Sequence, residues 1–530
     1  MLFTSYEFIL FLGIVFILYY LVPKKMQWKF LLLASYAFYF IASPFYLIYI
    51  LATTVTTFLA TRQIRIRKES FQKKFDLVKK ELDREQRKEM KEQEKKHQFR
   101  LMLFCLLFNL GILAVVKYTN FAIANVNAVI RLFDKDAALS FVNLIIPMGI
   151  SFYTFQSMGY LIDVYQGKYE AEKNPFKVAL FISFFPQLVQ GPISRFDELS
   201  KSLFAEHRAD YRTITFGLQR ILWGFFKKLV IADRMLTAVN AIIKDTETYH
   251  GVFVLVGMLF YALELYADFT GGIDITIGVA QTMGIRVTEN FRRPYFSKNI
   301  KEYWKRWHIT MGTWFTDYIF YPISICKTMQ RLSKFSRKHF GEQIGKRIPV
   351  YLSSFVVWFT TGIWHGASWN FIAWGIGNFV VIMISQELEP LYRKFHEHFS
   401  VEGRLPFKMF QVVRTVLLMS CLRMFDCYRD VPLTFKMFGS MITGFRIGDL
   451  TPAAFLGMGL TAWDYGILAV GAILLVTVSL VQRSGSVRER IAARSFPLRF
   501  VVWYGLFLAI VVFGAYGIGY SASQFIYNQF

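Results

Sequence analysis

A series of apolar runs, each close to the length that crosses a lipid bilayer, recurs from residue 6 to residue 519 and constrains this chain more than any other feature. A helix needs about 20 predominantly apolar residues to span the hydrocarbon core. Since some of the runs are short or polar, we expect about eleven transmembrane helices together with re-entrant or interfacial helices. The predicted fold class is an all-α, polytopic integral membrane protein. The candidate spans are 6–22, 28–43, 45–60, 101–116, 139–160, 176–190, 213–232, 250–267, 270–284, 350–384 (long enough for two), 409–425, 464–481 and 499–519.

The charged residues indicate how these spans are oriented. The chain has 61 lysines and arginines against 37 acidic residues, a net charge of +24. The basic residues form neither an isolated tail nor a nucleic-acid-reading helix, so nucleic acid is not expected as a partner. They lie between the apolar runs, where lysine and arginine keep loops on the cytoplasmic side. Segment 62–100, with 15 basic and eight acidic residues, is predicted to be a charged helical insertion in the cytoplasm. By the same rule 286–306, 327–347 and 483–499 are cytoplasmic, and the N-terminus and the tail YSASQFIYNQF lie outside.

We divide the chain into residues 1–120, with N-terminal transmembrane helices and the charged insertion, a core at 121–430, and C-terminal transmembrane helices in 431–530. The first run is expected to be a retained helix, because MLFTSYEF lacks the basic residues of a signal peptide. None of the four cysteines belongs to a CxxC pair or to a Cys/His cluster with metal-ligand spacing. We therefore expect free thiols, no metal and no bound cofactor. The cysteines are Cys105, Cys326, Cys421 and Cys427.

Two of the eight histidines differ from the others in their surroundings. His308, in YWKRWHITMGTW, and His365, in TTGIWHGASWNF, each follow a tryptophan and lie beside small or helix-breaking residues. His365 is near the middle of 348–386, a stretch of 39 residues without Asp, Glu, Lys or Arg, in which we expect a broken helix pair turning near 362–368. Ionisable groups at membrane depth are costly and are functional candidates by default. The others are expected to be solvated: His97, His207, His250, His339, His396 and His398.

A buried imidazole stays neutral, because a medium of low polarity disfavours its charged form. It can then accept a proton, as a general base must near neutral pH. No serine or cysteine lies in a GxSxG elbow, so covalent catalysis has no obvious nucleophile. The residues favour a base that activates a hydroxyl or thiol for attack on an acyl group. Proton relay in a transporter is the competing use of the same histidines.

Four segments follow one another along the chain: PMGISFYTFQSMGYLIDVY (147–165), FFPQLVQGPISRF (184–196), ELYADFTGGIDITIGVAQTMGIRVTENFRRPYFSKNIKEYWKRWHITMGTWFTDYIFYPI (264–323) and TGIWHGASWNFIAWG (361–375). Together with the ending QFIYNQF, this ordered set resembles the membrane-bound O-acyltransferase family. Within that family it is most similar to the bacterial alginate O-acetyltransferase branch.

The resemblance implies that His365, in Trp-His-Gly, is the catalytic histidine and that His308 takes the place of the family's second polar residue. It makes residues 121–430 the acyltransferase core, which a cytoplasmic acyl donor and an outer acceptor approach from opposite faces. The chain departs from the family at 270–274, where TGGID stands in place of the more usual Ser-Gly-Tyr-Ser-Asp.

Residues near the histidines are candidates for binding the substrate. Arg292, Arg293 and Arg306 place cations at the cytoplasmic approach to His308, and arginine can hold the phosphates of coenzyme A or a phosphopantetheine arm bidentately. Positive-inside anchoring is the alternative explanation of these arginines. Asp268 and Asp274 are expected to orient a histidine or to pair with an arginine, because a buried carboxylate without a partner is costly. The predicted substrate-binding set is Asp268, Asn290, Arg292, Arg293, Trp304, Arg306, Trp307 and Trp364.

The residues and the resemblance together predict a multi-pass enzyme of the bacterial cytoplasmic membrane. It takes acetyl from a cytoplasmic thioester, acetyl-CoA or an acyl-phosphopantetheine, and passes it outward for O-acetylation of an exported polysaccharide of the alginate type. His365 is the predicted general base, and His308 positions or polarises the acyl group. The expected partners are the donor, the polysaccharide, membrane lipid and a separate extracytoplasmic acyltransferase. The alternatives are D-alanyl transfer to teichoic acid from a carrier protein, a polytopic polysaccharide or proton-coupled transporter, and a structural membrane scaffold.

Overall fold

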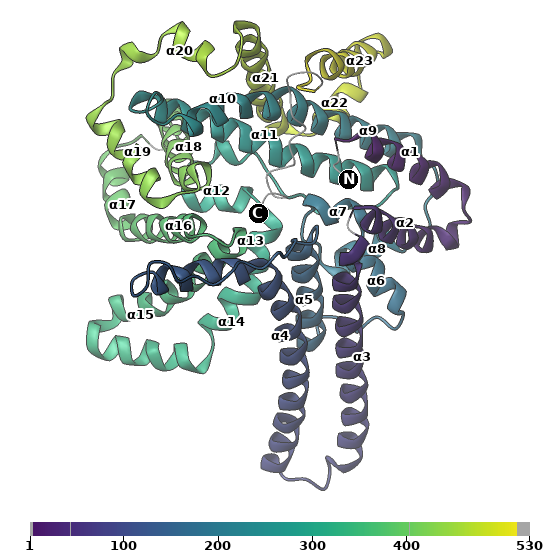
Figure 1. Cartoon of the computed structure of the whole chain (residues 1–530). Helices are drawn as coiled ribbons and strands as arrows, with labels where there is room; N and C mark the ends of the chain where they lie inside the picture. The colour runs from purple at the N-terminus through teal and green to yellow at the C-terminus, as the bar shows by residue number, and fades with distance from the viewer. Residues whose placement is uncertain (1–3, 43, 402, 517–530) are drawn as a thin grey trace. The chain divides into compact units, whose positions relative to one another are not determined.

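The computed structural model describes residues 4–42, 44–401 and 403–516 of the chain. In these ranges the regular elements are helices, and no strand is present (Figure 1). Seven helices of the described part are long and apolar enough to cross a membrane, and the helix Tyr6–Leu21 is apolar but shorter. The all-α membrane class is thus confirmed, whereas the predicted number of spans is not. The C-terminal tail at 520–530 lies outside the described residues.

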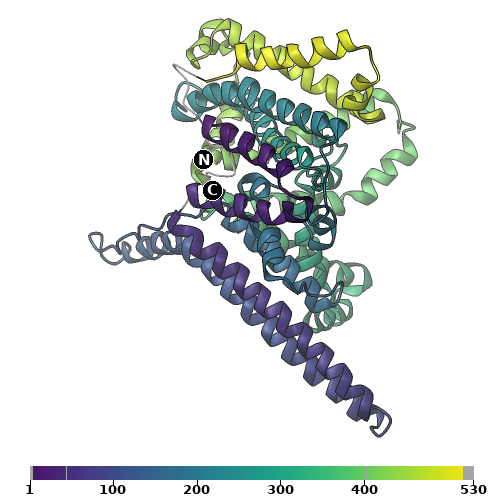
Figure 2. The ribbon, with the colours of Figure 1, turned by 90° about the vertical axis from the view of Figure 1, so that its right-hand side faces the viewer.

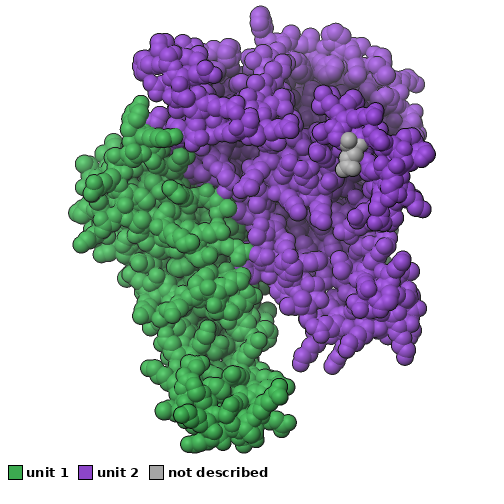
Figure 3. All heavy atoms as spheres, turned by 180° about the vertical axis from the view of Figure 1, so that it is seen from behind, with its two compact units in different colours: residues 1–214, 280–288 green, residues 215–279, 289–530 purple. Residues whose placement is uncertain are grey.

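The chain divides by its internal packing into two compact units, which have separate colours in Figure 3. Unit 1 comprises residues 1–214 and 280–288, and unit 2 comprises residues 215–279 and 289–530. The predicted division into 1–120, 121–430 and 431–530 rests on membrane topology and on the resemblance to a family, not on compactness. It stays a prediction.

The helices of unit 1 depart from the predicted spans at two places. The expected span 139–160 is helical only from Ile150 onward. Before it, backbone groups of Leu139 and Val142 bond instead to the side chains of Asn127 and Asn120 on the preceding helix. The expected span 176–190 is split at Phe184, because Pro186 cannot continue a helix that began at Pro175. The bounds are α1 Tyr6–Leu21, α2 Gln27–Ala42, α3 Leu47–Val78, α4 Arg84–Ile130, α5 Ile150–Gln166, α6 Pro175–Ser183, α7 Phe185–Gln190 and α8 Phe196–Leu203.

The charged insertion predicted at 62–100 is a helical hairpin formed by the end of α3 and the start of α4 (Figures 1 and 2). Asp83 begins α4 with a capping box: its carboxylate accepts from the Gln86 N–H at 2.7 Å, and the Gln86 side-chain oxygen accepts from the Asp83 N–H at 3.0 Å. Phe75 is buried in the hairpin, with the Phe71 ring 5.6 Å away and the Lys91 ammonium 4.8 Å above it. The predicted helical insertion is confirmed, and its side of the membrane stays a prediction.

Unit 2 contains the remaining helices, apart from the start of α9 and the end of α11, which belong to unit 1, and one of them corrects the sequence prediction. The spans expected at 250–267 and 270–284 form a single helix, α11, of 31 residues. Asp268 interrupts the apolar run, but its carboxylate accepts a hydrogen bond from the Lys228 ammonium at 2.6 Å, so the helix continues through it. The bounds are α9 Tyr211–Phe225 (divided by the unit boundary), a π-helical segment Phe226–Ala232, α10 Asp233–Lys244, α11 Val252–Thr282, α12 Ile300–Arg306, α13 Ile309–Phe315, a π-helical segment Thr316–Phe320, α14 Tyr321–Ser324, α15 Lys327–His365, α16 Trp369–Glu387, α17 Glu389–His398, α18 Leu405–Tyr428, α19 Val431–Thr443, α20 Pro452–Gly457, α21 Ala462–Val481, α22 Val487–Ala492 and α23 Phe496–Phe513.

The helix pair α15 and α16 positions one of the two histidines. The break between them lies at residues 366–368, inside the range predicted from the sequence. Gly375 allows the two helices to cross closely, because a Cβ there would lie 2.5 Å from the Trp358 carbonyl oxygen. A Cβ on Gly362 would similarly lie 2.6 Å from the Phe371 carbonyl oxygen. The two helices therefore pack closely beside the break, and α15 ends at His365.

Candidate active site

His308 precedes α13 in a backbone conformation that few residues adopt. Its φ of 48° and ψ of 55° lie in the left-handed region, which costs a residue with a Cβ about 1–2 kcal/mol. Asn290 holds the chain directly after this point. Its carbonyl oxygen accepts from the Ile309 N–H at 2.9 Å, and its Oδ1 accepts from the N–H and the hydroxyl of Thr310 at 3.1 and 2.9 Å. The predicted Asn290 therefore supports the His308 backbone.

The His308 ring is fully buried among aromatic rings and lies outside the seven candidate membrane-spanning helices. Its centroid is 5.1 Å from that of Phe269, 6.0 Å from that of Trp364 and 6.5 Å from that of Phe291. Burial, together with the nearby charge of Arg423, lowers the pKa of His308 to about 3. The ring is neutral at physiological pH, as the sequence predicted.

His365 is the last residue of α15 and is also buried. Its ring centroid is 4.6 Å from that of Trp374 and 6.3 Å from that of Phe371, which lies nearly parallel to it. Gly366 makes this packing possible, because a Cβ at that position would collide with the Phe371 ring. The Trp-His-Gly sequence thus places an imidazole at a helix end, against the first turns of α16.

Trp364 connects the two histidines. Its ring centroid is 6.0 Å from that of His308 and 5.1 Å from that of His365, which limits the separation of the two imidazole centroids to about 11 Å. None of the other six histidines is buried. The structure therefore brings together the two histidines that the sequence singled out, although their chemical roles stay predictions.

Arg423 was missed in the sequence and lies beside this pair. Its guanidinium is buried on α18, 4.7 Å from the Trp374 ring, 5.3 Å from the Trp307 ring and 5.9 Å from the Trp304 ring. Asp426, one turn further along α18, forms an ion pair with it at 3.6 Å. Cations over aromatic faces are attracted by the ring quadrupole, most strongly where water is excluded. The signal was present, since Arg423 is the one basic residue of the predicted span 409–425 apart from Arg414.

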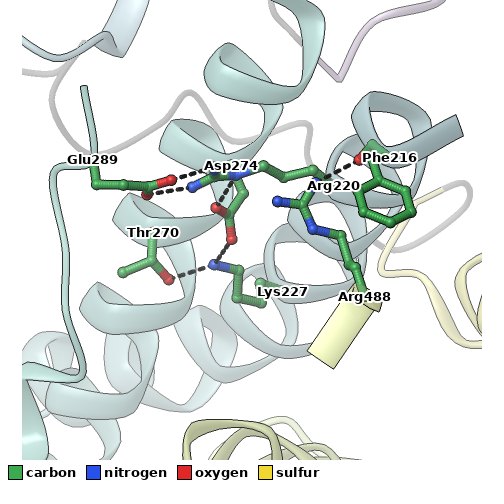
Figure 4. Close-up of polar contacts among 7 residues, drawn as sticks. All are labelled: Phe216, Arg220, Lys227, Thr270, Asp274, Glu289 and Arg488. Carbon is green, nitrogen blue, oxygen red and sulfur yellow. Dashed lines mark hydrogen bonds and ion pairs between the residues drawn. The ribbon is translucent and has the colours of Figure 1, made fainter. Parts of the chain in front are cut away.

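The two predicted carboxylates are engaged in ion pairs. Asp268 pairs with Lys228 at 2.6 Å, and Lys228 also pairs with Asp233 at 2.8 Å. Asp274 accepts from Arg220 at 2.8 Å, as predicted, and from Lys227 at 2.6 Å (Figure 4). Arg220 also binds both carboxylate oxygens of Glu289 at 2.6 Å. Removing one partner of such a buried pair would leave an uncompensated charge, which is strongly destabilising.

The three predicted arginines lie apart from the histidine rings. Arg293 donates to the Ser479 carbonyl at 3.1 Å, and Arg306 pairs with Glu302 at 2.5 Å. Arg292 and Arg293 line a cavity of about 1400 Å³ in unit 2. Phe291, which contacts His308, is also in its wall, but neither histidine lines it. Of the predicted tryptophans, Trp307 and Trp364 are buried, Trp304 is partly buried, and all three belong to the aromatic cluster around Arg423 and the histidines.

The fold and this site define a polytopic helical membrane protein with a buried pair of histidines. Residues 171–427 match the model of the membrane-bound O-acyltransferase family. The matched range contains both His308 and His365.

The chain is also similar to individual proteins whose names describe acyl transfer. The chain is 34% identical over 275 residues to a protein of Azotobacter vinelandii named probable alginate O-acetylase AlgI, covering 51% of this chain and 50% of that protein. It is 30% identical over 321 residues to a peptidoglycan O-acetyltransferase of Helicobacter pylori (56% and 57% covered). It is 29% identical over 258 residues to a teichoic acid D-alanyltransferase of Bacillus subtilis (48% and 62% covered). The chain spans about half the length of the curated relatives it matches.

Proposed function

We propose that this protein is an O-acyltransferase of the bacterial cytoplasmic membrane that moves acetyl from a cytoplasmic thioester toward the hydroxyl groups of an exported, alginate-type polysaccharide. The observation that carries the proposal is the pair of buried histidines, both in contact with Trp364 and both within the family-matched range. The names of the relatives support acyl transfer to a cell-surface polymer.

In the proposed reaction His365 is the general base. It accepts the proton of the attacking hydroxyl as the hydroxyl oxygen forms a bond with the thioester carbonyl carbon. The carbon–sulfur bond then breaks, and the proton passes to the leaving thiolate, so that an ester and a free thiol are formed. His308, which stays neutral, donates a hydrogen bond to the carbonyl oxygen as negative charge develops there.

The aromatic cluster supplies further support for a substrate with many acceptor atoms. Within the described residues, the buried indole N–H groups of Trp304, Trp307 and Trp374 have no hydrogen-bond acceptor. Buried donors are nearly always paired in proteins, so these three leave capacity for carbonyl or phosphate oxygens of a ligand. We assign Arg306, which does not line the cavity described below, to the phosphates of coenzyme A or of a phosphopantetheine arm. The first acceptor, whose hydroxyl attacks the thioester, carries the acetyl outward, and we assign its final transfer to sugar to an extracytoplasmic acyltransferase partner.

The test uses cells that lack this protein and make the polysaccharide. Complementation with the wild-type chain should restore the ester content of the extracellular polymer, whereas His365→Ala should lower it at least about a hundredfold, the usual contribution of a general base. His97→Ala, which alters an exposed histidine, is the matched control and should restore it fully. Full restoration by a correctly inserted His365→Ala variant would refute the role of His365.

D-alanyl transfer is the second candidate, favoured by the match to the Bacillus subtilis relative. Membranes containing the chain should release free thiol from acetyl-CoA. If thiol release occurs only with a D-alanyl thioester on a carrier protein, the acetyl proposal is wrong and the second candidate replaces it.

A further inference from the structure

The cavity of about 1400 Å³ in unit 2 has an apolar part and a cationic part. It exceeds the volume of roughly 300–1000 Å³ that is usual for small-molecule sites. Its apolar wall consists of one face of α21 and one face of α23, both candidate membrane-spanning helices. On α21 the lining residues recur every three or four positions from Trp463 to Val481, a length of about 27 Å along the helix axis. This is close to the thickness of the hydrocarbon core, about 30 Å.

The cationic part lies at one end of this wall. It is formed by Arg292, Arg293, Arg483 and Arg488, next to a balanced cluster in which Arg220 and Lys227 neutralise Asp274 and Glu289 (Figure 4). The two carboxylates that line the cavity are therefore already paired. In the described part of the chain, the guanidinium groups of Arg292, Arg293 and Arg483 have no carboxylate partner.

The pKa of Arg293 reflects the crowding of these cations. Partial burial and the neighbouring charges of Arg306 and Arg483 lower its pKa. Excess positive charge beside a low-dielectric wall attracts anions, and basic pockets between membrane helices commonly hold anionic lipid headgroups.

We propose that this cavity binds one anionic phospholipid of the surrounding membrane. The arginines hold the phosphate, and an acyl chain lies along α21 and α23. Two observations favour a lipid over the thioester donor. Neither His308 nor His365 lines the cavity, so its wall presents neither of the two buried histidines to a bound thioester. Of the residues of α23 only Ile510 is buried, so this helix lies at the edge of unit 2, where a lipid can enter from the side.

Two glycines in the cavity wall can be replaced by a larger residue without a clash with the protein. A Cβ on Gly466 or Gly505 would have no protein atom within 4 Å, although both line the cavity. Leucine at either position should therefore occupy lipid space and leave the protein intact. Gly111, on the spanning helix α4, is equally free of neighbours but does not line the cavity, so Gly111→Leu is its matched control.

The charged end has its own matched pair of variants. Arg483→Gln removes a cation from the cavity. Arg494→Gln removes an exposed cation that lies between α22 and α23 but does not line the cavity.

The experiment is native mass spectrometry of the full chain, released from nanodiscs that contain phosphatidylglycerol or phosphatidylcholine with the same acyl chains. We expect the wild-type chain to retain one phosphatidylglycerol and about tenfold less phosphatidylcholine. Gly505→Leu and Arg483→Gln should lower retention about tenfold, whereas Gly111→Leu and Arg494→Gln should match the wild type.

Equal retention by all variants, or equal retention of the two lipids, would overturn the proposal. Displacement of phosphatidylglycerol by an equimolar amount of coenzyme A would also overturn it and would assign the cavity to the acyl donor. Unchanged thermal midpoints show that the variants are folded. The experiment measures lipid retention and not enzymatic activity, so it tests the lipid site independently of the proposed acyl transfer.

Discussion

The left-handed backbone at His308 predicts that glycine at this position gives a more stable protein than alanine, the reverse of the usual order. His308→Ala and His308→Gly both remove the imidazole and differ only by the Cβ atom. At φ 48° and ψ 55° a Cβ costs about 1–2 kcal/mol, and glycine avoids this cost. The greater freedom of glycine in the unfolded chain costs about 0.5–1 kcal/mol. His308→Gly should therefore be more stable than His308→Ala, by about 0.5–1 kcal/mol.

His365 provides the matched control for this comparison, because it lies in the last turn of α15 with helical backbone. There the ordinary order applies, and His365→Gly should be less stable than His365→Ala by about 0.5–1 kcal/mol. The free energy of unfolding is measured for all four variants by denaturant titration in mixed micelles, followed by tryptophan fluorescence. If His308→Gly is the less stable variant of its pair, as at His365, Asn290 does not hold the chain in the left-handed conformation and the reasoning fails.

Two further predictions concern the same segment. Below pH 6.5 the histidine of the unfolded chain binds a proton, whereas His308 in the folded chain, with a pKa of about 3, does not. The free energy of unfolding therefore falls as the pH falls, by about 1.4 kcal/mol between pH 7.5 and pH 5.5. The same titration at the two pH values should show this loss in the wild type and not in His308→Gly, and parallel losses would contradict it. Asn290→Ala removes the acceptor of two hydrogen bonds from Thr310 and should lower the free energy of unfolding by about 2–3 kcal/mol, against about 1 kcal/mol for Thr310→Val, which loses only the hydroxyl bond. Equal losses in these two variants would show that the Thr310 N–H finds another acceptor.

The parts of the fold that follow from local chemistry were predictable from the sequence. The charged hairpin is an example, because its capping box and its aromatic contacts join residues close in sequence. The break before α16 is another, since small residues interrupt a long uncharged stretch. The continuity of α11 was not predictable in this way. Asp268 divides the run in the sequence, and its neutralisation by Lys228 depends on a contact 40 residues away.

The candidate site shows the same distinction. Burial of His308 and His365 was predictable from the apolar, glycine-containing segments around them. Arg423 was not recognised, although a cation in an apolar run is a signal for function. Its position over Trp307 and Trp374 joins three separate segments, and no spacing in the sequence reveals such a contact.

The two histidines are held by different contacts, and this difference supports the different roles that we propose for them. His308 is fixed by hydrogen bonds that the two residues after it donate to Asn290, and burial holds its pKa at about 3, so the ring stays neutral at physiological pH. A ring of this kind can donate a hydrogen bond without taking up charge. His365 sits at the end of α15, where Gly366 brings the Phe371 ring against it. In the proposed reaction the attacking hydroxyl gives up its proton, and since His308 is held neutral by burial, the proposal assigns that proton to His365.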